Sequence, residues 1–302
     1  MLFRSPELRG RAFAVREARV AKVSLERLRR GDLVTPFPGV RVTAELHGHA
    51  DRARAYAPRL RPDGFLSHTS AATLLGLPLP TVTDPRIHVS LPHGARAVRT
   101  PGVIGHHLVI AADEITVLDG IRVTTPERTW CDLAGWIPFD DLVAAGDRLL
   151  WRHDPLATRE ALAEMVHRHP GRRGRRDRVF ALPLLSERAD SSPETKLRCA
   201  VIRSGFPEPE VNPVLRGPAG EWIGQPDLAL VSYGEVLEYE GDGHRTDRTQ
   251  WRSDLARVPR FEAFDWHVIR VGGDDLRDGF RRVLDILEHR LLRAGWTGTR
   301  RS

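Results

Sequence analysis

The sequence predicts a mixed α+β protein (α/β in the broad sense) with three domains. The first observation is length, because 302 residues exceed what a single hydrophobic core usually serves. The second is that capped helical patterns and short apolar strands follow one another along the chain. The third is an arginine-rich stretch, Arg168 to Arg178, which we take as a boundary. We therefore expect domains at residues 1–50, 51–180 and 181–302.

The composition is that of a folded chain with an excess of positive charge. Charged residues make up 28% of the sequence, hydrophobic residues make up 41%, and the net charge is +6. A pI near 10.1 is compatible with a polyanionic partner, although a bias toward arginine can also arise from genome composition alone. Lysine occurs only at Lys22 and Lys196, so a lysine-dependent active site has few candidates.

The chain shows no feature of a membrane or secreted protein. None of its apolar stretches approaches the length of a membrane span, and the N-terminus lacks the apolar segment of a signal peptide. Cys131 and Cys199 lie far apart and are expected to be buried thiols in a reducing compartment. We expect a cytoplasmic protein without membrane contacts.

Residues 13–43 predict a small helical unit followed by a β-wing. Helices are expected from Ala14 to Arg19 and from Leu25 to Arg30, with Ser24 as N-cap of the second. Two strands are expected within Leu33 to Val42, and the whole layout is that of a winged helix-turn-helix. The candidates for DNA contacts are Arg27, Arg29, Arg30 and Arg41. The alternative is a helical cap with solvated arginines.

The middle region predicts short helices and strands. Helices are expected from Ser67 to Gly76 and after the cap Thr125, and strands at residues 87–90, 103–109 and 121–124. Residues 50–134 contain five histidines: His68, His88, His93, His106 and His107. No helical or loop spacing brings them together, so the sequence does not predict a histidine metal site.

Two amphipathic helices, over residues 139–152 and 158–169, precede the basic stretch. That stretch can track phosphates or serve as an exposed connection between domains, and the sequence leaves both open.

The last third predicts a sheet flanked by helices in the order α-β-β-β-α-β-α. Ser192 is expected to cap the first helix, with Pro193 at its first position. Strands are expected over residues 210–215, 222–230, from 235 onward and over 266–271. The remaining helices are expected over residues 246–263 and 276–292.

Acidic side chains accompany two of these strands. Glu238 and Glu240 project from one face, and Asp227 reaches that face if the two strands pair as a hairpin. Converging carboxylates repel one another, and a divalent cation relieves this, so oxygen ligands of this kind predict Mg²⁺ or Mn²⁺. The alternative is a set of solvated acids. Glu194 is explained as a helix-dipole partner that could also serve as an outer metal ligand.

The segment from Ser192 to about Leu292 resembles the restriction-endonuclease-like superfamily with the PD-(D/E)XK motif. It is most similar to the branch related to very-short-patch repair endonucleases, which includes a domain of unassigned function. The matching features are Ser191 to Glu194, Pro226 with Asp227, Glu238 to Gly241, His244, Asp254 with Arg257, and Trp266 to Val271. The resemblance implies an αβββαβ core.

The resemblance also implies roles for individual residues. Asp227 would be the central metal ligand and Glu238 the second acid. Glu240 stands where the motif has its lysine, a departure that puts the orientation of the attacking water in doubt. His244 or Arg257 would supply a proton relay or the missing positive charge. Glu240 is the third predicted metal ligand, and Glu194 completes the predicted catalytic set.

The N-terminal two-thirds resembles winged-helix antitoxins and regulators of the abortive-infection AbiEi type. The stretch that carries this likeness is Thr125 to Thr129, leading into Cys131 to Ala134.

Together these features predict a protein that binds double-stranded DNA and cleaves it with a Mg²⁺-dependent endonuclease domain. The alternative is a non-catalytic regulator or antitoxin in which the nuclease fold is degenerate, and the absent lysine favours it. A third alternative is an RNA-processing enzyme. A homodimer is compatible with each of these.

Overall fold

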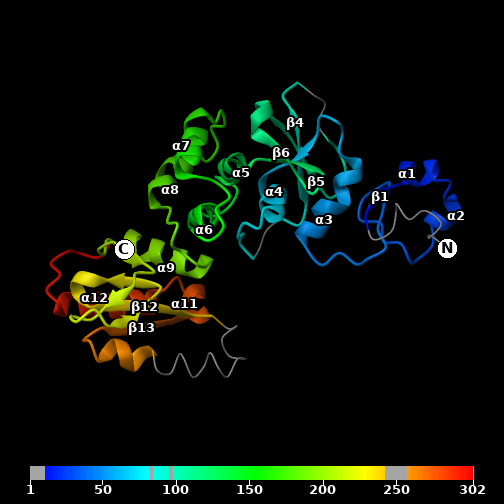
Figure 1. The fold of residues 1–302 in the computed structure, drawn as a ribbon. Helices are drawn as coiled ribbons and strands as arrows, with labels where there is room; N and C mark the ends of the chain where they lie inside the picture. The colour runs from blue at the N-terminus through cyan, green and yellow to red at the C-terminus, as the bar shows by residue number, and fades with distance from the viewer. Residues whose placement is uncertain (1–10, 82–83, 95–97, 242–256, 302) are drawn as a thin grey trace. The chain divides into compact units, whose positions relative to one another are not determined.

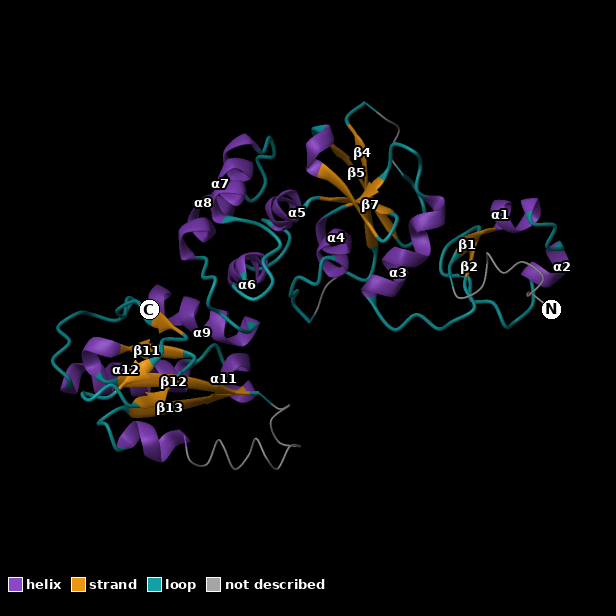
Figure 2. Ribbon diagram, viewed as in Figure 1, coloured by secondary structure: helices purple, strands orange, loops and turns teal. Residues whose placement is uncertain are grey.

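The computed structural model describes residues 11–81, 84–94, 98–241 and 257–301 (Figure 1). The chain divides into two compact units. Unit 1 comprises Met1–Phe139 with Ala157–Phe180, and unit 2 comprises Asp140–Leu156 with Ala181–Ser302. Both units combine helices with strands, so the predicted mixed α+β class is confirmed (Figure 2). The finer division at residues 50 and 180 stays a prediction.

The N-terminal part of unit 1 contains two short helices and a two-stranded sheet. Its elements are β1 (Phe13–Ala14), α1 (Val15–Val20), α2 (Leu25–Leu28) and β2 (Val40–Arg41). Helix α2 begins as predicted, because the hydroxyl of Ser24 accepts a hydrogen bond from the backbone N–H of Arg27 at 3.2 Å. The cap fixes the start of the helix that was expected to face DNA.

The predicted pair of strands within residues 33–42 forms only in part. β2 pairs antiparallel with β1 instead, and an isolated bridge joins Val34 to Val42. Pro36 and Pro38 have no backbone N–H, so this segment lacks donors that a continuous hairpin would need. The wing of the predicted winged helix is therefore reduced to this bridge.

The larger sheet of unit 1 has five strands in the order β5-β4-β3-β7-β6. They are β3 (Phe65–Leu66), β4 (Ile87–Pro92), β5 (Val103–Leu108), β6 (Ile115–Leu118) and β7 (Ile121–Thr124). β4 is parallel to β5 and antiparallel to β3, β3 is parallel to β7, and β7 is antiparallel to β6. The sequence did not predict β3 or β6, which are short or partly exposed.

Helices α3 (His49–Tyr56) and α4 (His68–Leu74) pack against this sheet, α5 (Pro126–Leu133) packs against α4, and α7 (Arg159–Arg168) packs against α5. The other helical elements of this part are α8 (Arg175–Ala181) and the 3-10 turns η3 (Ala57–Arg59) and η4 (Ala112–Glu114). As predicted, Thr125 caps α5 by accepting a hydrogen bond from the N–H of Arg128 at 3.3 Å. The core joins Ile87 and Val123 of the sheet to Tyr56 of α3.

One arginine of the basic stretch is buried, whereas the others are exposed. Arg178 is only 1% exposed and donates hydrogen bonds to the carbonyls of Gly171 at 2.6 Å and Arg173 at 2.9 Å. Arg173 is exposed and donates to the carbonyl of Gly135 at 2.9 Å. Arg178 therefore supports the fold of unit 1, and phosphate contact by the exposed arginines stays a prediction.

Unit 2 contains a four-stranded sheet in the order β13-β12-β11-β8 and a separate pair, β10-β9. The strands are β8 (Glu210–Val211), β9 (Leu215–Arg216), β10 (Trp222–Gly224), β11 (Leu228–Leu230), β12 (Glu235–Glu240) and β13 (His267–Gly272). The helical elements are α6 (Phe139–Leu150), η5 (Leu182–Leu184), α9 (Ser192–Arg203), η6 (Val231–Tyr233), α11 (Gly273–Arg277) and α12 (Arg281–Arg293), and residues 257–262 are also helical.

The helices and the four-stranded sheet of unit 2 follow the predicted order along the chain, and β9 and β10 form an additional pair between β8 and β11. β11 is antiparallel to both β8 and β12, whereas β12 is parallel to β13. Helices α9 and α12 contribute Leu197 and Leu287 to the same core as Leu228, Leu237 and Ile269 of the sheet. The predicted helix over residues 246–263 lies partly outside the described residues.

Four predicted boundaries in unit 2 are wrong. The hydroxyl of Ser191, not Ser192, caps α9 by accepting from the N–H of Glu194 at 3.4 Å. The strand predicted over 210–215 is divided between β8 and β9, and the strand predicted over 222–230 between β10 and β11; in each case the two pieces belong to different sheets. The last helix is split into α11 and α12, because Phe280 takes a left-handed conformation with φ of 63°.

Each helix that the structure describes is too short or too polar to span a bilayer.

Two aspartates of α6 form ion pairs with arginines of α9 in very different surroundings. Asp147 is 2% exposed, and its Oδ2 accepts hydrogen bonds from Arg198 Nη2 and Thr195 Oγ1, both at 2.7 Å. Asp140 pairs with Arg203 at 2.8 Å, but the Arg203 side chain is 62% exposed. The same two helices therefore carry a buried ion pair and a solvated one.

We expect Asp147→Ala to lower the free energy of unfolding of unit 2 by about 3–5 kcal/mol, because Arg198 is left buried without its carboxylate. Asp140→Ala is the matched control and should cost about 0–1 kcal/mol, as exposed pairs do. Urea unfolding of both variants measures the difference. Equal losses would contradict the assignment of the buried pair as the stronger constraint.

Candidate functional site

The acidic strands of unit 2 form the predicted hairpin. β11 and β12 pair with Leu228 opposite Leu237, which places the preceding Asp227 across from the end of β12. The carboxylate Oδ2 of Asp227 accepts a hydrogen bond from the backbone N–H of Tyr239 at 2.7 Å. This contact fixes Asp227 at the end of the sheet where the remaining acids lie.

Asp227 carries an unusual charge environment. Burial, and then the nearby charge of Glu194, raises the pKa of Asp227 to about 7. Glu194 is itself 8% exposed, and its Oε2 accepts from the N–H of Asp190 and from Asn212 Nδ2, each at 3.1 Å. The buried Glu194 therefore lies close enough for its charge to disfavour the ionised form of Asp227.

Glu238 and Glu240, the other two predicted metal ligands, each form an ion pair with an arginine, but only Glu240 is exposed. Glu238 forms an ion pair with Arg257 at 3.1 Å, and Arg257 also donates to the carbonyl of Gln225. Glu240 pairs with Arg270 at 3.1 Å, with its side chain 56% exposed. The structure thus brings Asp227, Glu194, Glu238 and Arg257 to one end of the sheet, and Glu240 faces solvent.

Oxygen donors of this kind suit Mg²⁺ or Mn²⁺ in their chemistry. Among the described residues, however, Asp227, Glu238 and Glu240 do not form a set whose ligand atoms all lie within 4.8 Å of one another. His244, the predicted proton relay, lies outside the described residues, as does Asp254.

The four arginines predicted to contact DNA fall into two pairs. Arg27 is bound by both carboxylate oxygens of Asp32, at 2.8 and 2.5 Å, and its side chain is 11% exposed. Arg41 donates to the carbonyls of Leu28 and Val40, both at 2.8 Å. Arg29 and Arg30 are exposed. The first pair supports the fold of this segment, and only the second pair is available to a partner.

A histidine cluster in unit 1 overturns the expectation that these residues do not meet. His68 begins α4, His88 lies on β4 and His106 on β5, and one ligand atom from each lies within 4.8 Å of the others. The rings of His68 and His106 are stacked at 4.2 Å between centroids, and those of His88 and His106 at 5.0 Å. His93 and His107 are exposed and do not take part.

The cluster depends on pairings that the local sequence does not reveal. β4 and β5 run parallel with Ser90 opposite His106, which places the histidines of the two strands near each other. His106 Nε2 and His88 Nδ1 are 2.9 Å apart and share a hydrogen bond. His68 is held at a φ of 48°, a left-handed conformation that costs a non-glycine residue about 1–3 kcal/mol.

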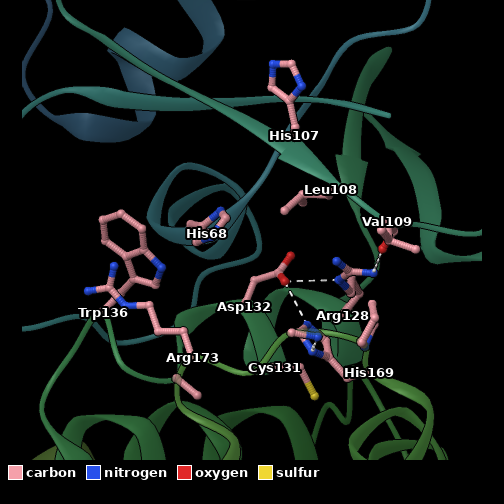
Figure 3. A pocket seen from close by; sticks show the side chains of 13 residues that line it. His68, His107, Leu108, Val109, Arg128, Cys131, Asp132, Trp136, His169 and Arg173 are labelled. Carbon is pink, nitrogen blue, oxygen red and sulfur yellow. Dashed lines mark hydrogen bonds and ion pairs between the residues drawn. The ribbon is translucent and has the colours of Figure 1, made fainter. Parts of the chain in front are cut away.

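A pocket of about 250 Å³ lies beside this cluster, and His68 lines it (Figure 3). Opposite His68, Asp132 accepts hydrogen bonds from Arg128 Nε at 3.0 Å and His169 Nε2 at 2.9 Å. Burial opposes ionisation of Asp132, but the His169 hydrogen bond and nearby positive charge keep its pKa below the usual value. Cys131 lines the same pocket, and burial raises the pKa of its thiol above the usual range, so it is not a nucleophile.

Burial keeps the three clustered histidines uncharged. It lowers the pKa of His68 and of His88 from the usual 6.5 to about 3, and that of His106 to about 4. Charges on neighbouring histidines would add to this effect. At neutral pH the cluster therefore presents neutral imidazoles, which is the form that binds metals or accepts protons.

Residues 64–185 match the family described as "AbiEi antitoxin C-terminal domain". The pocket and the histidine cluster lie within this range. The chain is also similar to two curated proteins of Mycobacterium tuberculosis strains, named "Uncharacterized protein MT2308" and "Uncharacterized protein Rv2248". Each is 27% identical over 232 residues, which cover 76% of this chain and 82% of the relative. The matched range supports the antitoxin resemblance of the sequence.

We expect unit 1 to lose stability as the pH falls from about 6.5 to 4. In this window the unfolded chain binds protons on His68, His88 and His106, whereas the folded chain does not. Each such histidine contributes up to about 1.4 kcal/mol per pH unit to the slope.

Thermal unfolding in EDTA across this pH range measures the effect. His106→Gln should flatten the dependence, and His107→Gln, which changes the exposed neighbour, should leave it as it is. A wild-type stability that rises on acidification would show that the cluster is not held neutral.

Proposed function

We propose that this protein is a DNA-binding regulator of the antitoxin type, located in the cytoplasm. The observation that carries the proposal is the match of residues 64–185 to the AbiEi antitoxin C-terminal domain. The segment before this range supplies the second support, since a capped helix presents exposed arginines there. In this proposal the N-terminal segment is a helix-turn-helix for duplex DNA, and a homodimer would match a two-fold symmetric site.

Only some of the arginines in the N-terminal segment are free to contact DNA phosphates. Arg29 and Arg30 follow α2 and are exposed, and Arg30 lies 3.9 Å from Glu26 in a loose ion pair. Such a pair is weak in water and yields readily to a phosphate. Arg27 and Arg41 instead hold α2 and β2 in place through Asp32 and the backbone carbonyls. The proposal therefore assigns the phosphate contacts to Arg29 and Arg30.

We expect the double variant Arg29→Ala, Arg30→Ala to bind duplex DNA more weakly and with a smaller salt dependence. If each arginine neutralises one phosphate, the slope of log K against log salt should fall by about 1.8 in magnitude. Fluorescence anisotropy with labelled duplex DNA over a range of salt concentrations measures both quantities.

The matched control is Arg277→Ala, Arg293→Ala, which removes the same charge from exposed positions of unit 2. Arg27→Ala is a second comparison, expected to lower thermal stability because Asp32 loses its partner. If the control reduces the slope as much as the test variant does, the binding reflects net charge and the assigned contacts are incorrect.

A metal-dependent nuclease activity in unit 2 is the second candidate. The observation that favours it is the Asp227 carboxylate beside Glu194, because burial and then the charge of Glu194 raise the pKa of Asp227, and a divalent cation would stabilise its ionised form. Glu238 would complete the oxygen donors, with Arg257 near the scissile phosphate. The cation would supply an activated water. The exposed position of Glu240 and its pairing with Arg270 weigh against a role for that residue.

We expect Asp227→Asn to abolish any cleavage of supercoiled DNA in Mg²⁺ or Mn²⁺ while the fold and DNA binding persist. The amide keeps the shape of the side chain and removes the buried charge, so stability near neutral pH should not fall. Glu210→Gln, on the neighbouring β8 and exposed, is the control. Cleavage that survives in Asp227→Asn would refute the site. DNA binding without cleavage by the wild type in any metal would leave the regulator as the function of the whole chain.

A further inference from the structure

We propose that His68, His88 and His106 bind one divalent transition-metal ion, for which zinc is the best match. The proposal is independent of DNA binding and of nuclease activity. It rests on three imidazoles from three different elements whose ligand atoms all lie within 4.8 Å of one another. Within the described residues, no other group of three or more histidine, cysteine or carboxylate side chains converges in this way.

The spacing of the nitrogens is close to that of a metal site. His88 Nδ1 and His106 Nε2 are 2.9 Å apart. Two nitrogens bound to tetrahedral zinc at 2.0–2.1 Å lie about 3.3 Å from each other. A small separation of the two rings therefore admits the ion. The ring that donates this hydrogen bond would bind the metal as its other tautomer, with its proton on the second ring nitrogen, so both rings remain neutral imidazoles.

The third ligand is oriented by hydroxyl groups behind it. The Ser67 hydroxyl is 2.8 Å from His68 Nδ1 and 2.5 Å from the hydroxyl of Ser90. A hydrogen bond at Nδ1 leaves Nε2 as the nitrogen that can bind a metal. Metal-binding histidines usually donate their second N–H to such a partner, which fixes the tautomer and the direction of the ring.

The surroundings also favour a metal over a purely packed cluster. The three rings are kept neutral by burial, so each has a lone pair available without deprotonation at pH 7. His68 is held in a left-handed backbone conformation, an uncommon arrangement that directs its imidazole toward the other two. The Trp136 ring lies edge-on to all three imidazoles at 5.2–5.5 Å and closes one side of the cluster.

The ligand set selects the class of metal. Three imidazoles without a carboxylate suit Zn²⁺, Co²⁺, Ni²⁺ or Cu²⁺ and are poor ligands for Mg²⁺ or Mn²⁺. Asp132 lies outside the ligand group, and its negative charge acts on His68 and His106 against the opposing charges of Arg128 and Arg173. Three protein ligands leave a fourth position for water or a small ligand, and the pocket lined by His68 offers access to it.

The test uses the full-length chain without a histidine tag. Cobalt titration, followed by its visible absorption, gives stoichiometry and coordination, and displacement by zinc gives the zinc affinity. We expect one tetrahedral cobalt per chain, with no sulfur-to-cobalt charge-transfer band, since the cysteines are not ligands. His88→Gln and His106→Gln should each weaken zinc binding about 100-fold or more.

Two variants sharpen the comparison. His107→Gln changes the next residue on β5, which is exposed, and should bind zinc as the wild type does. His68→Asn removes the third ligand with a residue that tolerates the left-handed backbone conformation. If a variant does not fold, NMR of the histidine ring nitrogens in the wild type, recorded with and without zinc, takes the place of that variant. The ring-nitrogen resonances of three histidines should then shift on zinc addition.

The proposal would be overturned by absence of zinc uptake in the folded wild-type chain. Zinc binding that all the ligand variants retain, or a cobalt spectrum with a thiolate band, would overturn it equally. In each of these cases the cluster is a packed set of neutral histidines.

Discussion

The buried guanidinium of Arg128 is the charge around which unit 1 is built. Its side chain is 1% exposed, and an unpaired charge at that depth would cost several kcal/mol on folding. Glu114 of η4 and Asp132 of α5 both pair with it, and His169, just after α7, donates to Asp132. These contacts fix η4, α5 and the residue after α7 relative to one another. Arg128, Asp132 and His169 also line the pocket beside the histidine cluster.

The two groups of ionisable side chains in the protein differ in how their charge is compensated. In unit 1, burial favours the uncharged form of the histidines, and the nearby Asp132 is satisfied by its own hydrogen bonds. In unit 2, burial and mutual repulsion leave Asp227 poorly compensated, although Arg257 and the Tyr239 N–H offset part of the cost. The neutral imidazoles of unit 1 can bind a cation through their nitrogens. In unit 2, a cation bound by the carboxylate oxygens, or a proton on Asp227, would offset the unfavourable charge.

The features that the sequence predicted well are those determined by neighbouring residues. The caps at Ser24 and Thr125 and the hairpin of β11 with β12 depend on side chains within a few positions. The histidine cluster depends on the parallel register of β4 and β5 and on the start of α4, and no local pattern encodes it. Arg27 shows an intermediate case, since Asp32 five residues later was a visible partner that would have removed it from the DNA-facing set.

The N-terminal segment shares only part of its apolar residues with the core of the unit 1 sheet, because Leu28 of α2 packs in a separate cluster with Phe13 and Ala18. Phe37 and Val40 pack in the same cluster as Tyr56 of α3 and Ile87 of β4. The segment proposed to bind DNA is therefore joined to the sheet by packing as well as by the chain. A condition that loosens β4, the strand that carries His88, would also loosen the support of that segment. Arg41 of β2 donates to the Leu28 carbonyl of α2, so a change in the core of the sheet would reach the DNA-facing residues through β2.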